Sequence, residues 1–210
     1  FEDRVTQQYD IKTFDSSATP AAALAVGRAV VEFTDAPATN PPARLDEFRQ
    51  GEFLVSAGGQ LRWRAGAGPR DGHFELRSEG TAAVVGFAQG RKAELGAVDI
   101  VSHTPYAAIY VTAREPDRTL RNAKGWLIGA IGRAHNTDMK YASGKLIERG
   151  KAPIRLEPVV FDLTIHRPGA KVRILDHDGV PTGESLQPDT AGRLTIDGRK
   201  TRTPYYLVEF

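Results

Sequence analysis

Residues able to bind a sugar gather in one short stretch of the chain. Sugar-binding β-proteins combine an exposed aromatic ring, which stacks on the pyranose face, with planar polar groups that hydrogen-bond pairs of hydroxyls. The segment after Ile131 supplies both kinds, and neighbouring apolar runs add further rings. The candidate contact residues are His135, Asn136, Asp138, Tyr141, Trp126 and Tyr106. The same semi-polar mixture suits contact with a neighbouring domain, and the aliphatic neighbours of Trp126 also suit a core position.

Other motifs that could carry chemistry are weaker. Asp176, Asp178 and Gly179 match the opening of a calcium loop, but the further acidic ligands and the distal Glu are missing, so a tight Asp-Gly turn is predicted. The five histidines lack the spacing of metal ligands. With no cysteine in the chain, thiolate catalysis, Cys-ligated zinc and disulfides are excluded. We expect no catalytic residue, no metal and no cofactor.

A jelly-roll polysaccharide lyase is the enzymatic alternative. In that chemistry a Tyr or His removes a proton while a basic or amide side chain neutralises the uronate. His135, Asn136, Lys140 and Tyr141 are residues of the right types, but the Arg-Glu-Arg and Gln-x-His strand motifs expected of lyases are missing. A small stand-alone jelly-roll lyase or glycoside hydrolase therefore stays open as the alternative to a non-catalytic module.

The elements that must position these residues are strands. From residue 52 onward, short runs rich in β-branched and aromatic residues alternate with Gly, Pro and Asn. The runs cover residues 82–87, 98–101, 107–113, 126–131, 159–165, 172–175, 194–196 and 205–210. A hairpin joins residues 53–55 to 61–63 through two glycines. The pattern predicts an all-β fold, an antiparallel, jelly-roll-like β-sandwich.

Two segments of this sandwich carry finer predictions. Residues 73–77 alternate with period two, which predicts that Phe74 and Leu76 face the core while His73, Glu75 and Arg77 face water. Residues 82–87 do not alternate and are predicted to be buried on both faces. Within that run, Gly86 indicates a bulge or a close approach of another backbone segment.

Residues 1–42 have a different character and are predicted to form an N-terminal extension and linker that contributes a strand to the sandwich of residues 43–210. Residues 21–26 are rich in Ala and would suit a short helix, but Gly27 and the valines that follow favour a strand beginning near Leu24. Three prolines make residues 35–42 a linker or long loop. The chain begins at Phe1 without Met or a signal-like apolar stretch, so we expect a processed product or part of a longer protein, with Phe210 near its true end.

Composition narrows the choice of partners. A length of 210 residues suits one main domain with a substantial core. The net charge is only +2 and the basic residues are scattered, so nucleic acid is not an expected partner. The apolar runs are far shorter than the roughly 20 residues that cross a bilayer, so no membrane association is expected.

Several segments, taken in order, resemble the C-terminal β-sandwich of secreted bacterial glycoside hydrolases that have a (β/α)8 catalytic barrel. The resemblance covers about residues 50–210 and rests mainly on Gly129-Ala-Ile-Gly-Arg-Ala-His-Asn-Thr137. The supporting segments are residues 53–63, 72–76, 82–87 and 156–159. A barrel needs about 250 residues in alternating strands and helices, and this chain has neither that length nor that pattern.

The resemblance implies a non-catalytic accessory module of a carbohydrate-active enzyme, in a secreted or periplasmic protein. Its implied partners are a catalytic (β/α)8 domain of the same protein and a polysaccharide or oligosaccharide. Which sugar is bound does not follow from these residues.

Overall fold

The computed structural model describes residues 22–28, 44–68 and 70–210. The chain divides into two compact units, Phe1–Ala65 and Gly66–Phe210. The predicted boundary after residue 42 lies inside the first unit. Among the described residues of that unit are α1 (Ala23–Val26), the 3-10 helix η1 (Leu45–Phe48) and three strands, β1 (Arg49–Gln50), β2 (Phe53–Val55) and β3 (Leu61–Arg64).

In the first unit the predicted hairpin is confirmed, and the predicted strand before it is wrong. Strands β2 and β3 pair antiparallel, with Leu54 opposite Trp63, as the apolar runs and intervening glycines predict. The predicted strand beginning near Leu24 is wrong, because Ala23–Val26 form the single helical turn α1. Alanine is the best helix former, and Gly27 ends the turn, so local propensity prevails here over the β-branched residues that follow. The predicted linker at residues 35–42 lies outside the described residues.

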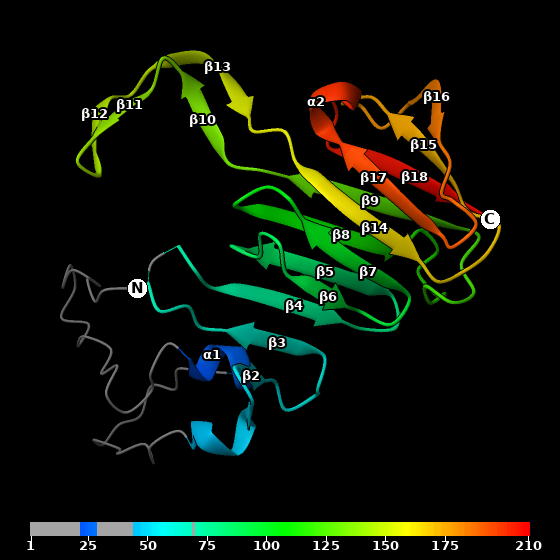
Figure 1. Cartoon of the computed structure of the whole chain (residues 1–210), viewed down its shortest axis with the longest axis horizontal. Helices are drawn as coiled ribbons and strands as arrows, with labels where there is room; N and C mark the ends of the chain where they lie inside the picture. Colours follow the sequence, from blue (N-terminus) through cyan, green and yellow to red (C-terminus); the bar gives the residue numbers. More distant parts are fainter. Residues whose placement is uncertain (1–21, 29–43, 69) are drawn as a thin grey trace, which may run out of the picture. The chain divides into compact units, whose positions relative to one another are not determined.

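The second unit is an antiparallel β-sandwich, which confirms the predicted all-β fold (Figure 1). Its larger sheet has the strand order β4 (His73–Arg77), β5 (Thr81–Gly86), β8 (Ala107–Ala113), β9 (Gly125–Ile131), β18 (Tyr205–Glu209), β15 (Lys171–Leu175), β16 (Pro181–Leu186). The second sheet has the order β17 (Arg193–Asp197), β14 (Val160–Ile165), β7 (Val98–Ser102), β6 (Lys92–Glu94). A four-residue helix, α2 (Gly198–Thr201), follows β17.

The core of this unit lies between the two sheets. Trp126 and Tyr206 from the larger sheet and Phe161 and Ile100 from the smaller one are almost completely buried in a single cluster. Phe210 packs edge-on against Trp126, with 4.6 Å between ring centroids. Full burial of one such side chain stabilises a fold by roughly 1.5–3 kcal/mol, so this cluster is the main stabilising contribution to the sandwich. None of the described helices is both long and apolar enough to cross a membrane.

Strand β4 turns His73 and Glu75 inward while Arg77 stays exposed as predicted, so the prediction that Phe74 and Leu76 face the core is wrong. His73 and Glu75 are 2% and 5% exposed, whereas Phe74 is 36% exposed. Glu75 lies opposite Val84 of β5, which belongs to the core, and opposed side chains share one face of a sheet. The two buried polar groups contact each other, with Nε2 of His73 3.3 Å from Oε1 of Glu75. Alternation separates two faces, but the partner strand decides which of them is buried.

The predicted turn and the predicted close approach are both present. The side chain of Asp176 accepts hydrogen bonds from the backbone N–H groups of Asp178 and Val180, which closes the turn between β15 and β16. A Cβ atom at Gly86 would lie 2.6 Å from the carbonyl oxygen of Gly72, so only glycine allows these backbones to approach. The prediction that residues 82–87 are buried on both faces is wrong at Val85, which is 37% exposed. Val85 lies opposite Phe74, on the face of the sheet away from the core.

Residues 134–156, which none of the predicted strand runs covers, form a β-ribbon. Strand β10 (Ala134–Thr137) pairs antiparallel with β13 (Lys151–Leu156), and β11 (Lys140–Ala142) pairs with β12 (Lys145–Glu148). We call these four strands the ribbon. It leaves the sandwich after β9 and returns to it before β14 (Figure 1). Most of its side chains are exposed, because no third strand joins either two-stranded ladder.

Candidate functional site

The ribbon carries an unusual concentration of exposed apolar side chains. Five of its large hydrophobic residues are between 46% and 68% exposed: Tyr141, Leu146, Ile147, Ile154 and Leu156. Leu156 lies opposite Ala134, and Ile154 lies opposite Asn136. Leu156 and Ile154 are two residues apart in β13, so their side chains share one face of the β10–β13 ladder. In the β11–β12 ladder, Tyr141 lies opposite Leu146. The ribbon therefore presents apolar surface along both of its ladders.

Two of the predicted contact residues hold the ribbon together. The Nδ2 atom of Asn136 donates a hydrogen bond of 2.9 Å to the carbonyl oxygen of Arg149. Asp138 has a left-handed backbone with φ of 61° and lies 3.2 Å from Nζ of Lys151. Aspartate tolerates this conformation better than most residues do, so its position at the bend between β10 and β11 has a structural reason. The type of each residue is thus explained without a ligand.

The other predicted contact residues fall into two places. His135 and Tyr141 belong to the ribbon, where His135 is half-buried opposite Arg155 and Tyr141 is exposed. Tyr106 belongs to the sandwich, where its ring meets the ring of Phe87 edge-on at 5.1 Å. Trp126 is completely buried in the core, so its ring is not available to stack on a sugar. The structure therefore brings four of the six predicted residues together on the ribbon.

The ribbon is also basic. Residues 133–157 contain six Lys and Arg residues against three Asp and Glu residues, whereas the whole chain has a net charge of only +2. Each carboxylate is paired: Glu157 with Arg133, Glu148 with Lys140 and Asp138 with Lys151. A hydrogen bond to Glu157 raises the pKa of Arg133 further. Among the described residues, this leaves three cations without a carboxylate partner: Lys145, Arg149 and Arg155.

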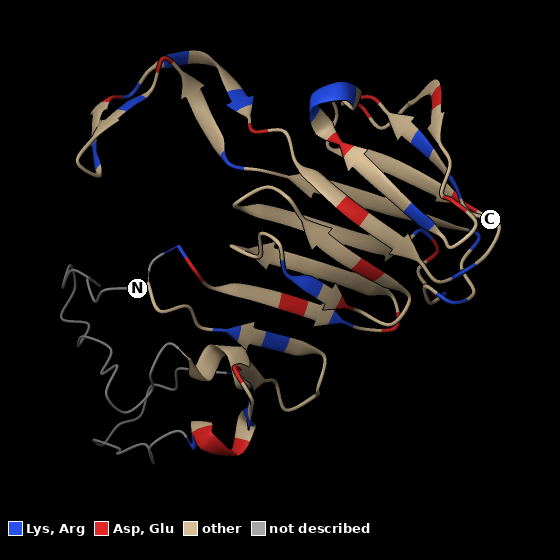
Figure 2. Ribbon diagram, viewed as in Figure 1, with Lys and Arg blue, Asp and Glu red and all other residues tan. Residues whose placement is uncertain are grey.

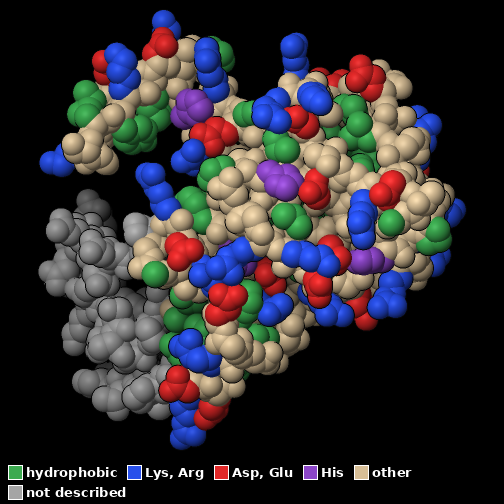
Figure 3. Space-filling model, in the orientation of Figure 1, with side chains coloured by type: hydrophobic (Ala, Val, Ile, Leu, Met, Phe, Trp, Pro, Cys, Tyr) green, Lys and Arg blue, Asp and Glu red, His purple; other side chains and the backbone are tan. Residues whose placement is uncertain are grey.

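A second cluster of functional groups lies on the outer face of the smaller sheet, whose strands carry both acidic and basic residues (Figure 2). Strand register defines two rows across β6, β7, β14 and β17. The first row is Lys92, Val101, Asp162 and Thr195. The second row is Glu94, Asp99, Thr164 and Arg193. We call these two rows, with His103 and His166 beside them, the polar face; acidic, basic and His side chains are intermingled there (Figure 3).

Two carboxylates organise the polar face. Oδ2 of Asp99 lies 2.9 Å from Nζ of Lys92, and Oδ1 of Asp99 lies 2.9 Å from Nε2 of His166. Asp162 accepts a 2.6 Å hydrogen bond from the Thr195 hydroxyl and lies 2.8 Å from Nε2 of His103. Desolvation tends to raise the pKa of both carboxyl groups, but their hydrogen bonds outweigh it and hold each pKa below its ordinary value. Both groups are therefore fixed, ionised acceptors at neutral pH.

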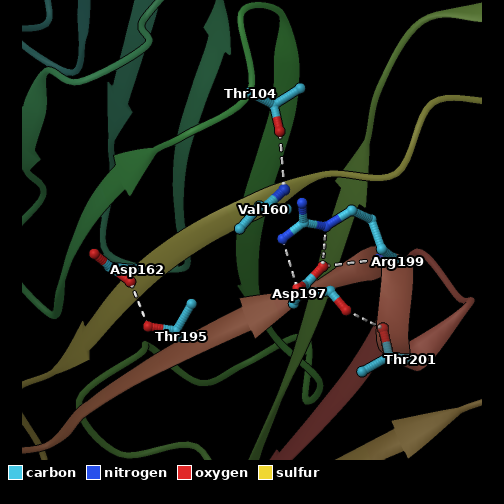
Figure 4. A network of polar contacts seen from close by, with 7 residues as sticks. All are labelled: Thr104, Val160, Asp162, Thr195, Asp197, Arg199 and Thr201. Carbon is cyan, nitrogen blue, oxygen red and sulfur yellow. Dashed lines mark hydrogen bonds and ion pairs between the residues drawn. The ribbon is translucent and has the colours of Figure 1, made fainter.

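Further polar contacts fix the end of the sheet where β14 begins and β17 ends (Figure 4). Asp197 is the N-cap of α2 and accepts hydrogen bonds from the backbone N–H and the guanidinium of Arg199. The hydrogen bonds from Arg199 outweigh desolvation and lower the pKa of Asp197 to about 2. At the start of β14, the Thr104 hydroxyl accepts a 2.9 Å hydrogen bond from the backbone N–H of Val160.

The polar face was missed in the sequence analysis, although each strand carries a local signal. In β14 the apolar residues Phe161, Leu163 and Ile165 alternate with outward-facing polar ones, and β7 and β17 alternate in the same way. In the part of the chain that the structure describes, no group of His, Asp and Glu is arranged to hold a metal ion.

Comparisons of the chain with models of known protein families, with curated proteins and with solved structures find no match.

Proposed function

We propose that the chain is a non-catalytic β-sandwich module of a bacterial carbohydrate-active enzyme, a glycoside hydrolase, and that it docks on the catalytic (β/α)8 domain of the same protein and contacts its polysaccharide. The observation that carries the proposal is the ribbon. A two-stranded ribbon is at best marginally stable in water, and contiguous exposed apolar surface marks an interaction site. The apolar residues of the ribbon therefore require a covering surface.

The charge of the ribbon indicates what that surface is like. Lys145, Arg149 and Arg155 have no carboxylate partner among the described residues, so the complementary surface is apolar with acidic groups at its rim. A domain of the same polypeptide suits this contact, because tethering provides a millimolar effective concentration, at which a small interface is enough. The ordered segments that resemble accessory domains of glycoside hydrolases favour a catalytic barrel as that domain.

The non-catalytic part of the proposal rests on what the ribbon residues do. Of the four residues suited to a lyase, Asn136 holds the ribbon together and Lys140 lies 2.8 Å from Glu148 in an ion pair. His135 and Tyr141 lie on the exposed ribbon, where water competes for every polar contact, whereas catalytic groups work best in sites that exclude water. The ribbon geometry is thus better suited to docking than to proton transfer.

Hydrogen exchange tests the docking. The gene that encodes the chain is sequenced first, and we expect it to encode a (β/α)8 domain upstream of the chain. Amide exchange is then compared between the isolated 210-residue chain and the full-length protein. We expect slower exchange in residues 133–157 of the full-length protein, because docking covers their amides. The turn at Val180, which is 56% exposed, is the control and should not change. Equal exchange of the ribbon in both proteins would contradict docking.

Activity assays test the proposal that the chain is non-catalytic. We expect the purified chain to release neither reducing ends nor unsaturated products from polysaccharides and aryl glycosides. An activity that disappears in both His135→Ala and Tyr141→Phe variants would instead support the lyase or hydrolase alternative, since these are the residues on the ribbon able to move a proton.

A further inference from the structure

We propose that the polar face of the smaller sheet binds a neutral oligosaccharide. This inference deepens the proposed function and rests on it for the class of polymer, because it assigns the polysaccharide contact to a site away from the ribbon. The ribbon then serves the neighbouring domain, and the polar face serves the sugar.

The polar face is hollow enough to hold a ligand. A pocket of about 730 Å³ extends over it, and its lining includes residues from all four strands of the sheet together with Asp189 from the turn before β17. Ligand sites in proteins usually enclose roughly 300–1,000 Å³. The backbone below is a four-stranded ladder, so the side chains that line the pocket are held on rigid elements.

The chemistry of the pocket suits a molecule rich in hydroxyl groups. Each sugar hydroxyl both donates and accepts hydrogen bonds, so a complementary site must offer both functions side by side. Asp162 accepts, Arg193 donates, and the hydroxyl of Thr164, which lies opposite Arg193 in the second row, does either. The Arg193 side chain has no hydrogen bond or ion pair with the described residues, so its donors are available to a ligand. Val101, beside Asp162, gives the C–H face of a sugar ring an apolar contact.

The ion pairs of the polar face contribute little to the stability of the fold, but they hold the carboxylates in fixed positions for a ligand. Exposed ion pairs contribute little to stability, because water screens the charges and both side chains lose conformational freedom. The side chains of His103 and Asp162 are 45% and 47% exposed, so their contact belongs to this weak class. At Asp99, which is 12% exposed, the partners Lys92 and His166 are still about half exposed to water. These contacts do fix the carboxylates in place, which reduces the entropy that a ligand must overcome on binding.

The balance of charge favours a neutral sugar over a charged one. Asp99, Asp162 and Asp189 line the pocket together with Lys92 and Arg193, so the carboxylates outnumber the Lys and Arg side chains by one. This excess of negative charge would repel an acidic polysaccharide. The remaining carboxylates and cations of the pocket are equal in number, so they do not call for a charged ligand. The described residues that line the pocket include no Phe, Tyr or Trp, so binding depends on hydrogen bonds and is weak.

An NMR titration of the ¹⁵N-labelled chain tests the inference. The probes are cellohexaose, xylohexaose, mannohexaose and maltohexaose, with hexagalacturonate as the charged comparison. We expect at least one neutral probe to shift the amides of Asp162, Thr164 and Arg193. Thr164→Val should weaken that binding about threefold and Arg193→Gln about tenfold, the ordinary effect of losing one neutral or one charge-assisted hydrogen bond.

Arg118→Gln is the matched control, because Arg118 is exposed on a loop outside the pocket. Far-UV circular dichroism verifies that each variant folds. The inference is overturned if no neutral probe shifts these amides, if only hexagalacturonate does, or if the control weakens binding as much as Arg193→Gln does. Shifts confined to residues 133–157 overturn it as well, while leaving ribbon docking intact. Binding at the polar face with no change in ribbon exchange upholds it and contradicts only the docking.

Discussion

At the scale of single residues, Asp197 shows how one side chain joins two elements. It ends β17 and begins α2, and it accepts one hydrogen bond from the backbone N–H of Arg199 and two from its guanidinium. Aspartate is a favoured N-cap residue because its oxygens satisfy backbone donors that a helix end leaves open. The cation two residues later strengthens the same contact and makes it dependent on ionisation of the carboxyl group.

The pKa of Asp197 predicts a pH dependence of stability. Because the folded-state pKa of about 2 lies below the ordinary value of 3.8, the contact stabilises the fold above pH 4 and is lost as the pH falls toward 2. Asp197→Asn keeps the cap but removes the charge. We expect this variant to be less stable than the wild type in urea unfolding at pH 7, with the difference shrinking as the pH falls below 4. Arg199→Gln should raise the pKa of Asp197 toward 3.8 in a carboxyl NMR titration. A native pKa of 3.8 or higher would contradict this account.

At the scale of elements, the ribbon and the sandwich strands differ in what they contribute to stability. Residues of β7 alternate between core and surface, whereas every residue of β12 is exposed. Burial of apolar area is the dominant favourable term in folding, so an element that buries little area adds little stability. The ribbon is therefore expected to matter for binding rather than for the stability of the isolated chain.

A matched pair of substitutions separates these roles. Ile100 in β7 is 1% exposed and Ile147 in β12 is 62% exposed. We expect Ile100→Ala to lower the free energy of unfolding by about 2–5 kcal/mol, because it leaves a cavity between the sheets. Ile147→Ala should change it by less than about 0.5 kcal/mol. Urea unfolding of both variants measures the difference, and a cost at Ile147 comparable to that at Ile100 would show that the ribbon packs on the sandwich.

At the scale of the whole molecule, the buried core cluster lies entirely within the second unit. Its members run from Ala82 to Val208, with Phe210 packed against them. We therefore predict that residues 66–210 fold without residues 1–65. Trp126 is the only tryptophan in that fragment, and it is fully buried, so its fluorescence reports on the core directly.

The fragment should show blue-shifted Trp126 emission and one cooperative urea transition. Its far-UV circular dichroism should be dominated by β-structure, since the only helix described in this unit, α2, has four residues. Emission at the wavelength of a water-exposed tryptophan, or a gradual transition, would mean that the first unit is needed to complete the core.

The sequence alone is enough to identify most strands of the sandwich and several of its turns. The runs at residues 107–113 and 98–101 match β8 and β7 closely, and the turn closed by Asp176 is present. These features depend on neighbours along the chain: β-branched runs favour extended backbone, and Asp or Gly favours the tight turn that ends it. The candidate contact residues on the ribbon could also be named from the sequence, although their ribbon structure could not.

Which residues meet across strands depends on the tertiary structure. The inward orientation of His73 and Glu75 depends on their pairing with β5, and the ribbon depends on the pairing of β10 with β13. The polar face is the clearest case. His166 and Asp99 are 67 residues apart in the chain, and His103 and Asp162 are 59 apart, yet each pair is in hydrogen-bonding contact. Register between strands is set by the packing of the whole core, so such contacts leave no signal in any local stretch of sequence.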